Sequence, residues 1–148
     1  MNTLAIIVDT TEDRSILNFF SQHNNTISNT SKIIILFVAK DRWFSFNEPR
    51  SILASLETRN HSEGVDRKNI INYLSEIEKS LRAINKSVEI VKIVVFGTEK
   101  YKVGKCLRLL KVEMCMVKTR KRSILQKLIT KSMHEFINQD LKIPVILL

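Results

Sequence analysis

VEMCMV, at Val112–Val117, is the first of four segments that decide the fold. It is followed by a basic turn, KTRKR at Lys118–Arg122, by an amphipathic stretch that predicts a helix, and by IPVILL at Ile143–Leu148. The two apolar segments predict buried strands, and a crossover helix between parallel strands is the repeating unit of an open α/β sheet. Because the basic turn follows the carboxyl end of a strand, where such sheets bind ligands, we expect function there.

Three further apolar runs predict strands at Leu4–Val8, Ile33–Val38 and Val88–Phe96. Short continuous runs of this kind are typical of strands that are buried on both faces of a parallel sheet. The third run is interrupted by the polar residues Glu89 and Lys92, which indicates a strand at the edge of the sheet.

Helical patterns lie between these strands. The first begins with a capping-box pattern at Thr10 and is expected to end near His23, before a turn at Asn24-Asn25. The second is the clearest, and it is expected to carry Glu78 and Arg82 on its outer face. The predicted helices cover approximately residues 10–23, 66–84 and 98–110.

Length and composition indicate one domain over residues 1–148, in which Asp41–Val65 forms a long loop without a readable pattern. No apolar run approaches the roughly 20 residues that span a membrane, and no signal peptide is recognisable, so we expect a cytoplasmic protein. Cys106 and Cys115 lie in apolar contexts that predict buried, reduced thiols. The formal net charge of +9 favours anionic partners.

Residues 117–148 resemble the C-terminal signature of the universal stress protein family, in which a strand leads into G-x2-G-x9-G-[ST], a helix and a short strand that opens with proline. The glycine positions fall on Lys118, Lys121 and Lys131, and the hydroxyl position falls on Ser132. The spacing fits without a gap, but lysine replaces each glycine. The resemblance implies an α/β fold: a single doubly wound, five-stranded parallel sheet of order 3-2-1-4-5, with helices on both faces and a variable loop at residues 41–65.

In that order the sheet reverses direction between its first and fourth strands, and ligands bind at such a switch point. The two strands end at Asp9-Thr10 and Lys118–Arg122. The resemblance also implies that the aspartate at the end of the first strand helps to hold a nucleotide. The candidate anion or nucleotide pocket therefore consists of Asp9, Thr10, Val38, Lys118, Lys121, Lys131 and Ser132.

A glycine loop binds phosphates because backbone N–H groups approach the oxygens closely and glycine readily adopts positive φ. Lysine at all three positions opposes both features, so we expect ATP to bind weakly or not at all, and we expect no cofactor. The segment between Glu113 and Glu135 nevertheless contains no acidic residue. It is either a solvated basic face or an anion site that recognises phosphate by charge.

Two functions from different classes follow. The first is a non-enzymatic stress-response or regulatory protein of the universal stress protein type, which acts through protein contacts. The alternative is a nucleotide- or polyanion-binding module that uses Lys118–Arg122. No Ser/His/Asp or Cys/His set is suggested by spacing, and the scattered His23, His61 and His134 predict no metal site.

The segment Ile143–Leu148 is an almost wholly apolar edge strand in the predicted order, and such edges invite pairing with another chain. Only two residues oppose such pairing, namely Lys142, which precedes the strand, and Pro144, which lacks a backbone donor. We therefore expect a homodimer in which this strand pairs with its own copy, as the family resemblance also implies. The alternative is that a helix or the loop Asp41–Val65 covers the edge.

Overall fold

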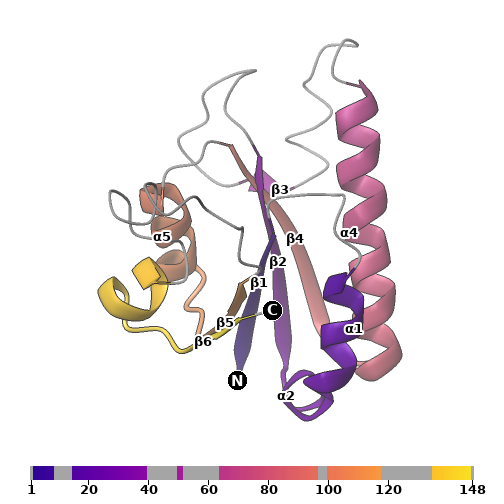
Figure 1. The fold of residues 1–148 in the computed structure, drawn as a ribbon, viewed down its shortest axis with the longest axis horizontal. Helices are drawn as coiled ribbons and strands as arrows, with labels where there is room; N and C mark the ends of the chain where they lie inside the picture. The colour runs from indigo at the N-terminus through magenta and orange to yellow at the C-terminus, as the bar shows by residue number, and fades with distance from the viewer. Residues whose placement is uncertain are drawn as a thin grey trace.

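The computed structural model describes residues 2–8, 15–39, 50–51, 64–96, 100–117 and 135–147. Within these ranges six strands form one sheet in the order β3-β4-β2-β1-β5-β6 (Figure 1). The strands are β1 Thr3–Val8, β2 Lys32–Ala39, β3 Arg50–Ser51, β4 Glu89–Phe96, β5 Met114–Val117 and β6 Val145–Leu147.

The five parallel strands are β4-β2-β1-β5-β6, which is the order 3-2-1-4-5 along the chain, so the predicted fold class is confirmed. One strand was not predicted. Arg50–Ser51 pairs antiparallel with β4, and Arg50 lies opposite Val94. The described part of the 41–65 region therefore extends the β4 edge of the sheet and does not cover the β6 edge.

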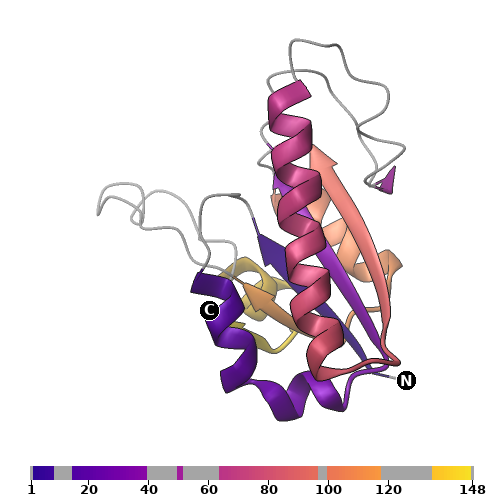
Figure 2. The same cartoon turned by 90° about the vertical axis from the view of Figure 1, so that its right-hand side faces the viewer.

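Helices lie on both faces of the sheet (Figures 1 and 2). On one face lie α1 Ser15–Gln22, α2 Asn24–Ser28 and the long helix α4 Gly64–Ile84. On the other face lie α5 Lys100–Leu109 and the short π-helix η2 Phe136–Asp140. The crossover helix predicted after the basic turn falls mostly on residues 118–134, outside the described residues, and its described end is the π-helix.

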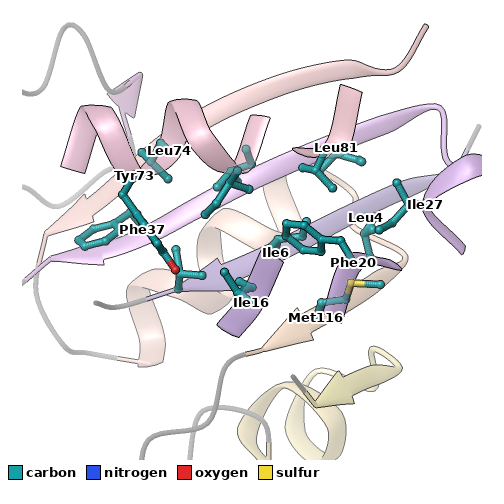
Figure 3. Close-up of a cluster of buried hydrophobic side chains, with 14 of the residues drawn as sticks. Leu4, Ile6, Ile16, Phe20, Ile27, Phe37, Tyr73, Leu74, Leu81 and Met116 are labelled. Carbon is teal, nitrogen blue, oxygen red and sulfur yellow. The ribbon is translucent and has the colours of Figure 1, made fainter. Parts of the chain in front are cut away.

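Alternating side chains of the strands divide the core into two layers, because successive residues of a strand point to opposite faces. Ile6 of β1 packs toward α1 and α4, where Phe20, Tyr73 and Leu81 complete one layer (Figure 3). Ile7, its neighbour, packs in the layer under α5. Because the central strands are buried on both faces, their sequences are continuous apolar runs.

The second layer contains a close approach between α5 and η2. A Cβ atom at Gly104 would lie 3.2 Å from two ring carbons of Phe136 and 3.5 Å from a methyl carbon of Leu141. Glycine inside a helix costs about 1 kcal/mol relative to alanine. Its presence at position 104 is explained by the ring that packs directly against the helix backbone.

The end of α5 has the hydrogen bonds of a Schellman motif. Val112 N–H donates to Leu107 C=O at 3.1 Å, and Lys111 N–H donates to Arg108 C=O at 3.2 Å. Lys111 accordingly has a positive φ of 54°. Val112 is thus buried as part of this motif, and the strand begins at Met114, two residues later than the sequence pattern predicts.

The turn predicted at Asn24-Asn25 is wrong, because these residues begin α2. Two features hold this short helix. Ile27 is fully buried, and the Asn85 side chain lies at the C-terminal end of the helix. Asn85 Nδ2 donates to the carbonyls of Ile27, Ser28 and Thr30 at 3.0, 3.3 and 2.9 Å. The last carbonyls of α2, which have no partner within the helix, are thereby satisfied.

Glu78 does not point outward from α4 as predicted. Its carboxylate accepts a hydrogen bond from Lys92 Nζ of β4 at 2.7 Å and another from Arg82 Nε at 3.2 Å. The contact with Lys92 is the main reason that the pKa of Glu78 lies below its ordinary value. Lys92, which interrupts the apolar run of β4, therefore links this strand to α4 through its hydrogen bond with Glu78.

Glu78→Gln is expected to lower the free energy of unfolding at pH 7 by about 1 kcal/mol. A lowered folded-state pKa means that the carboxylate stabilises the protein above the ordinary pKa of 4.5, and that this contribution is lost as the pH falls through the folded-state value. Urea unfolding of both proteins at pH 7 and at about pH 3 measures the difference.

The matched control is Glu89→Gln, which removes a longer and more exposed lysine contact, Lys32 to Glu89 at 3.6 Å. At pH 7 we expect the effect of Glu89→Gln to be smaller than that of Glu78→Gln. A difference between wild type and Glu78→Gln that stays the same from pH 7 to pH 3 contradicts the role of the carboxylate charge.

Candidate functional site

The switch point of the sheet lies between β1 and β5. These strands are parallel neighbours, and Ile7 lies beside Val117. The chain continues from β1 to α1 on one face and from β5 to η2 on the other, as the side-chain packing of the two helices shows. Because consecutive connections leave toward opposite faces, the carboxyl ends of β1 and β5 are where an open sheet of this kind has its ligand crevice.

The described strand ends at this position are apolar. Val8 and Val117 are buried, and their side chains belong to the two different core layers. Val38, the one candidate pocket residue within the described ranges, lies near the carboxyl end of β2 with 8% of its surface exposed. The side chains of these three valines are apolar, so through them the described strand ends offer a ligand only an apolar floor.

The other six candidate residues lie outside the described residues: Asp9, Thr10, Lys118, Lys121, Lys131 and Ser132. What the structure does describe is where the chain leaves the sheet toward them. Asp9 follows Val8 in the sequence, Lys118 follows Val117, and these two strands are hydrogen-bonded neighbours. Neighbouring strands lie about 4.8 Å apart. The chain thus departs toward both parts of the candidate site from adjacent points.

Both cysteines are buried free thiols, which confirms the prediction from their apolar contexts. Cys106 of α5 and Cys115 of β5 lie in the core layer between that helix and the sheet. Burial raises the pKa of Cys106 to about 11 and that of Cys115 to about 12. The thiolate is the nucleophilic form of cysteine, so at neutral pH neither side chain is suited to nucleophilic chemistry.

A hollow lies at the other end of the sheet from the switch point, where β1 and β5 begin. Its volume is about 370 Å³. It is lined by Asn2, Thr3, Leu4, Thr26, Asn29, Thr30, Glu113 and Met114. Hydroxyl and amide groups dominate the lining, and Glu113 is its only charged residue. Sequence patterns did not reveal this hollow, because its lining comes from segments far apart along the chain.

Within the part of the chain that the structure describes, no three His, Cys, Asp or Glu side chains are grouped as a metal ion requires. None of its helices has both the length and the apolar character needed to cross a membrane.

The sequence matches no protein-family model and no curated protein. Solved structures do match it. A universal stress protein in complex with cAMP has a TM-score of 0.61 at 15% identity, covering 99% of this chain and 95% of its own. A hypothetical protein whose biochemical function was assigned from its structure has a TM-score of 0.66 at 16% identity, covering 99% and 94%.

A third match is a universal stress protein family protein from Arabidopsis thaliana with AMP bound. Its TM-score is 0.57 at 13% identity, and the alignment covers 100% of this chain and 91% of that protein. Identities this low are informative about the backbone and not about individual site residues. The sheet order, the helices on both faces and these matches agree that the chain has the fold of the universal stress proteins.

Proposed function

We propose that this protein is a non-enzymatic regulatory protein of the universal stress protein type that lacks the family's usual ATP binding. The observation that carries the proposal is the combination of the shared fold with lysine at all three glycine positions of the phosphate-binding motif. Backbone N–H groups cannot approach a triphosphate closely where a lysine side chain and its Cβ atom intervene. The apolar side chains of Val8, Val38 and Val117 add no polar contact in their place.

The alternative is a nucleotide- or polyanion-binding module. It is favoured by the six lysine and arginine residues between Glu113 and Glu135, a stretch without acids, and by two structural neighbours that hold cAMP and AMP. A single phosphate needs fewer backbone contacts than a triphosphate. Charge from Lys118, Lys121 and Lys131 is sufficient for a site of lower selectivity.

Calorimetric titration of the whole chain with ATP, AMP and cAMP tests the proposal. We expect no saturable ATP binding with a Kd below about 1 mM. ATP that copurifies at stoichiometric occupancy overturns the proposed loss of ATP binding. Saturable binding of AMP or cAMP in the absence of ATP binding supports the alternative function.

A titration with polyphosphate at several salt concentrations separates a real anion site from a solvated basic face. Net charge must be matched, because any loss of cations weakens polyanion binding. The test variant replaces the three motif lysines by serine, and the control replaces three exposed lysines in or just after α4 by serine: Lys68, Lys79 and Lys86. A loss of affinity and of salt dependence confined to the test variant supports the anion site, whereas equal losses support the solvated face.

Dimerisation through β6 is the second part of the proposal. Among the described strands β6 ends the sheet, and Leu147 is 51% exposed. A regulatory protein that acts through contacts gains a stable, symmetric platform from such pairing.

A further inference from the structure

The polar hollow where β1 and β5 begin has walls that are fixed by hydrogen bonds. One wall is the end of α2, which lies at this end of the sheet (Figures 1 and 2). Asn85 Nδ2 donates to Thr30 C=O at 2.9 Å and holds this wall, while Glu113 N–H donates to Thr3 C=O at 3.0 Å and holds the other. The hollow is therefore preformed. Its volume of about 370 Å³ lies within the range of about 300–1,000 Å³ that is usual for small-molecule sites.

Polar side chains in the lining have hydrogen-bonding capacity to spare. Among the residues that the structure describes, the Glu113 carboxylate and the side-chain amides of Asn2 and Asn29 find no hydrogen-bond or ion-pair partner. Thr30 is only 7% exposed, and its hydroxyl donates to Thr26 C=O at 2.7 Å, so its oxygen can now only accept. A carboxylate also only accepts. The buried hydroxyl oxygen and the one charged group of the lining thus both call for donors.

The described lining disfavours several other ligands. An anion would meet the Glu113 carboxylate and no lysine, arginine or histidine. Metal ions are typically held by several carboxylate, imidazole or thiolate groups, and Glu113 is the only such side chain in the described lining. A neutral polyol forms hydrogen bonds but leaves the charge of Glu113 uncompensated.

We propose that the hollow binds a small organic ammonium ion that also carries a hydroxyl or amide group. An ammonium group has three donors and no acceptor, which matches the carboxylate and the Thr30 oxygen. The second polar group of the ligand is matched by the unpaired amides of Asn2 and Asn29, and its carbon chain by Leu4 and Met114, the apolar part of the lining. This inference goes beyond the proposed function, because the hollow and the switch point lie at opposite ends of the sheet.

The net charge of +9 does not prevent a cation from binding here. At physiological ionic strength, exposed charges are screened over about 8 Å. Lys32, which follows the hollow-lining connection into β2, is paired with Glu89 at 3.6 Å. A cation in the hollow therefore interacts most strongly with Glu113, the charged residue that lines it.

An NMR titration of the isotope-labelled whole chain tests the proposal with four-carbon probes that differ in their end groups. We expect 4-aminobutan-1-ol to bind saturably with a Kd of about 1–10 mM and to shift the amide signals of Asn29, Thr30 and Met114. Butane-1,4-diol lacks the ammonium group, and succinate carries two carboxylates. Each is expected to bind at least about tenfold more weakly.

Variants separate the hollow from general attraction by negative charge. Glu113→Gln keeps the shape of the side chain and removes its charge, so it is expected to weaken binding of 4-aminobutan-1-ol about tenfold. Glu89→Gln is the matched control, because Glu89 begins β4 at the same end of the sheet and does not line the hollow. It is expected to change affinity by less than about twofold. Thr26→Leu keeps every charge but adds bulk to the lining, and about fivefold weaker binding is expected.

The amide spectrum of each variant shows whether its fold is retained. No saturable shifts with 4-aminobutan-1-ol, or shifts only outside the hollow, overturn the proposal. So does unchanged affinity in Glu113→Gln, or an equal loss in Glu89→Gln. Equal or tighter binding of butane-1,4-diol or succinate contradicts the ammonium class of ligand. The ATP titration decides the proposed function separately, because none of these variants changes the predicted nucleotide positions.

Discussion

Asn85→Asp is expected to lower the free energy of unfolding by about 2–4 kcal/mol at pH 7. The Asn85 amide donates to three backbone carbonyls at the end of α2 and in the connection to β2. Aspartate has nearly the same shape but no donor, so its carboxylate would face three carbonyl oxygens. Both the lost hydrogen bonds and the charge repulsion act against the folded state.

Asn85→Ala removes the donor without adding a charge, and its expected loss is smaller, about 1–2 kcal/mol. Asn72→Asp is the matched control, because Asn72 is an exposed asparagine of α4, the helix that ends one residue before Asn85. Its expected effect is within about 0.5 kcal/mol. Urea unfolding curves of the three variants give these values. Equal losses for Asn85→Asp and Asn85→Ala contradict the argued repulsion between the carboxylate and the three carbonyls. A loss below about 0.5 kcal/mol for Asn85→Ala contradicts the role of the amide donor.

The parallel sheet could be predicted because each of its strands has a local signature. The runs at β1 and β2 are buried on both faces and therefore apolar throughout. The order of the strands is a long-range property, and it came from the spacing around Lys118, Lys121 and Lys131 that resembles the universal stress proteins. β3 has two residues and no such signature, so pairing with β4 decides its conformation.

The features that sequence reasoning missed depend on contacts between distant residues. Asn85 lies 55 residues from Thr30 and 58 from Ile27, so nothing near Asn24 in the sequence shows that its helix is capped. Glu78 and Lys92 are 14 residues apart, and each looked like a solvent-facing residue of its own element. At the candidate site, the switch point agrees with prediction, whereas the ligand-binding role of all seven candidate residues, Val38 included, remains a prediction.

Introducing lysine into β6 is expected to dissociate the proposed homodimer. Pro144 C=O accepts a hydrogen bond from Cys115 N–H at 2.9 Å, so the backbone groups of Pro144 face β5. Along a strand these directions alternate, which turns the N–H and C=O groups of Val145 and Leu147 toward the open edge. The missing donor of the proline therefore lies on the side that is already paired. It does not protect the edge, which supports self-pairing more strongly than the sequence alone did.

Sedimentation of the wild-type chain at micromolar concentration is expected to give twice the monomer mass of 17.2 kDa. Val145→Lys with Leu147→Lys is expected to weaken the dimer at least about 100-fold, because two charges then enter an apolar contact. Leu147→Lys alone serves as the milder variant, since Leu147 is half-exposed and its replacement spares the core. Leu109→Lys with Ala83→Lys adds the same charge at two exposed positions on helices and is expected to leave the dimer intact. A folded wild-type monomer refutes the β6 dimer, and a dimer that survives both β6 variants places the interface on another surface.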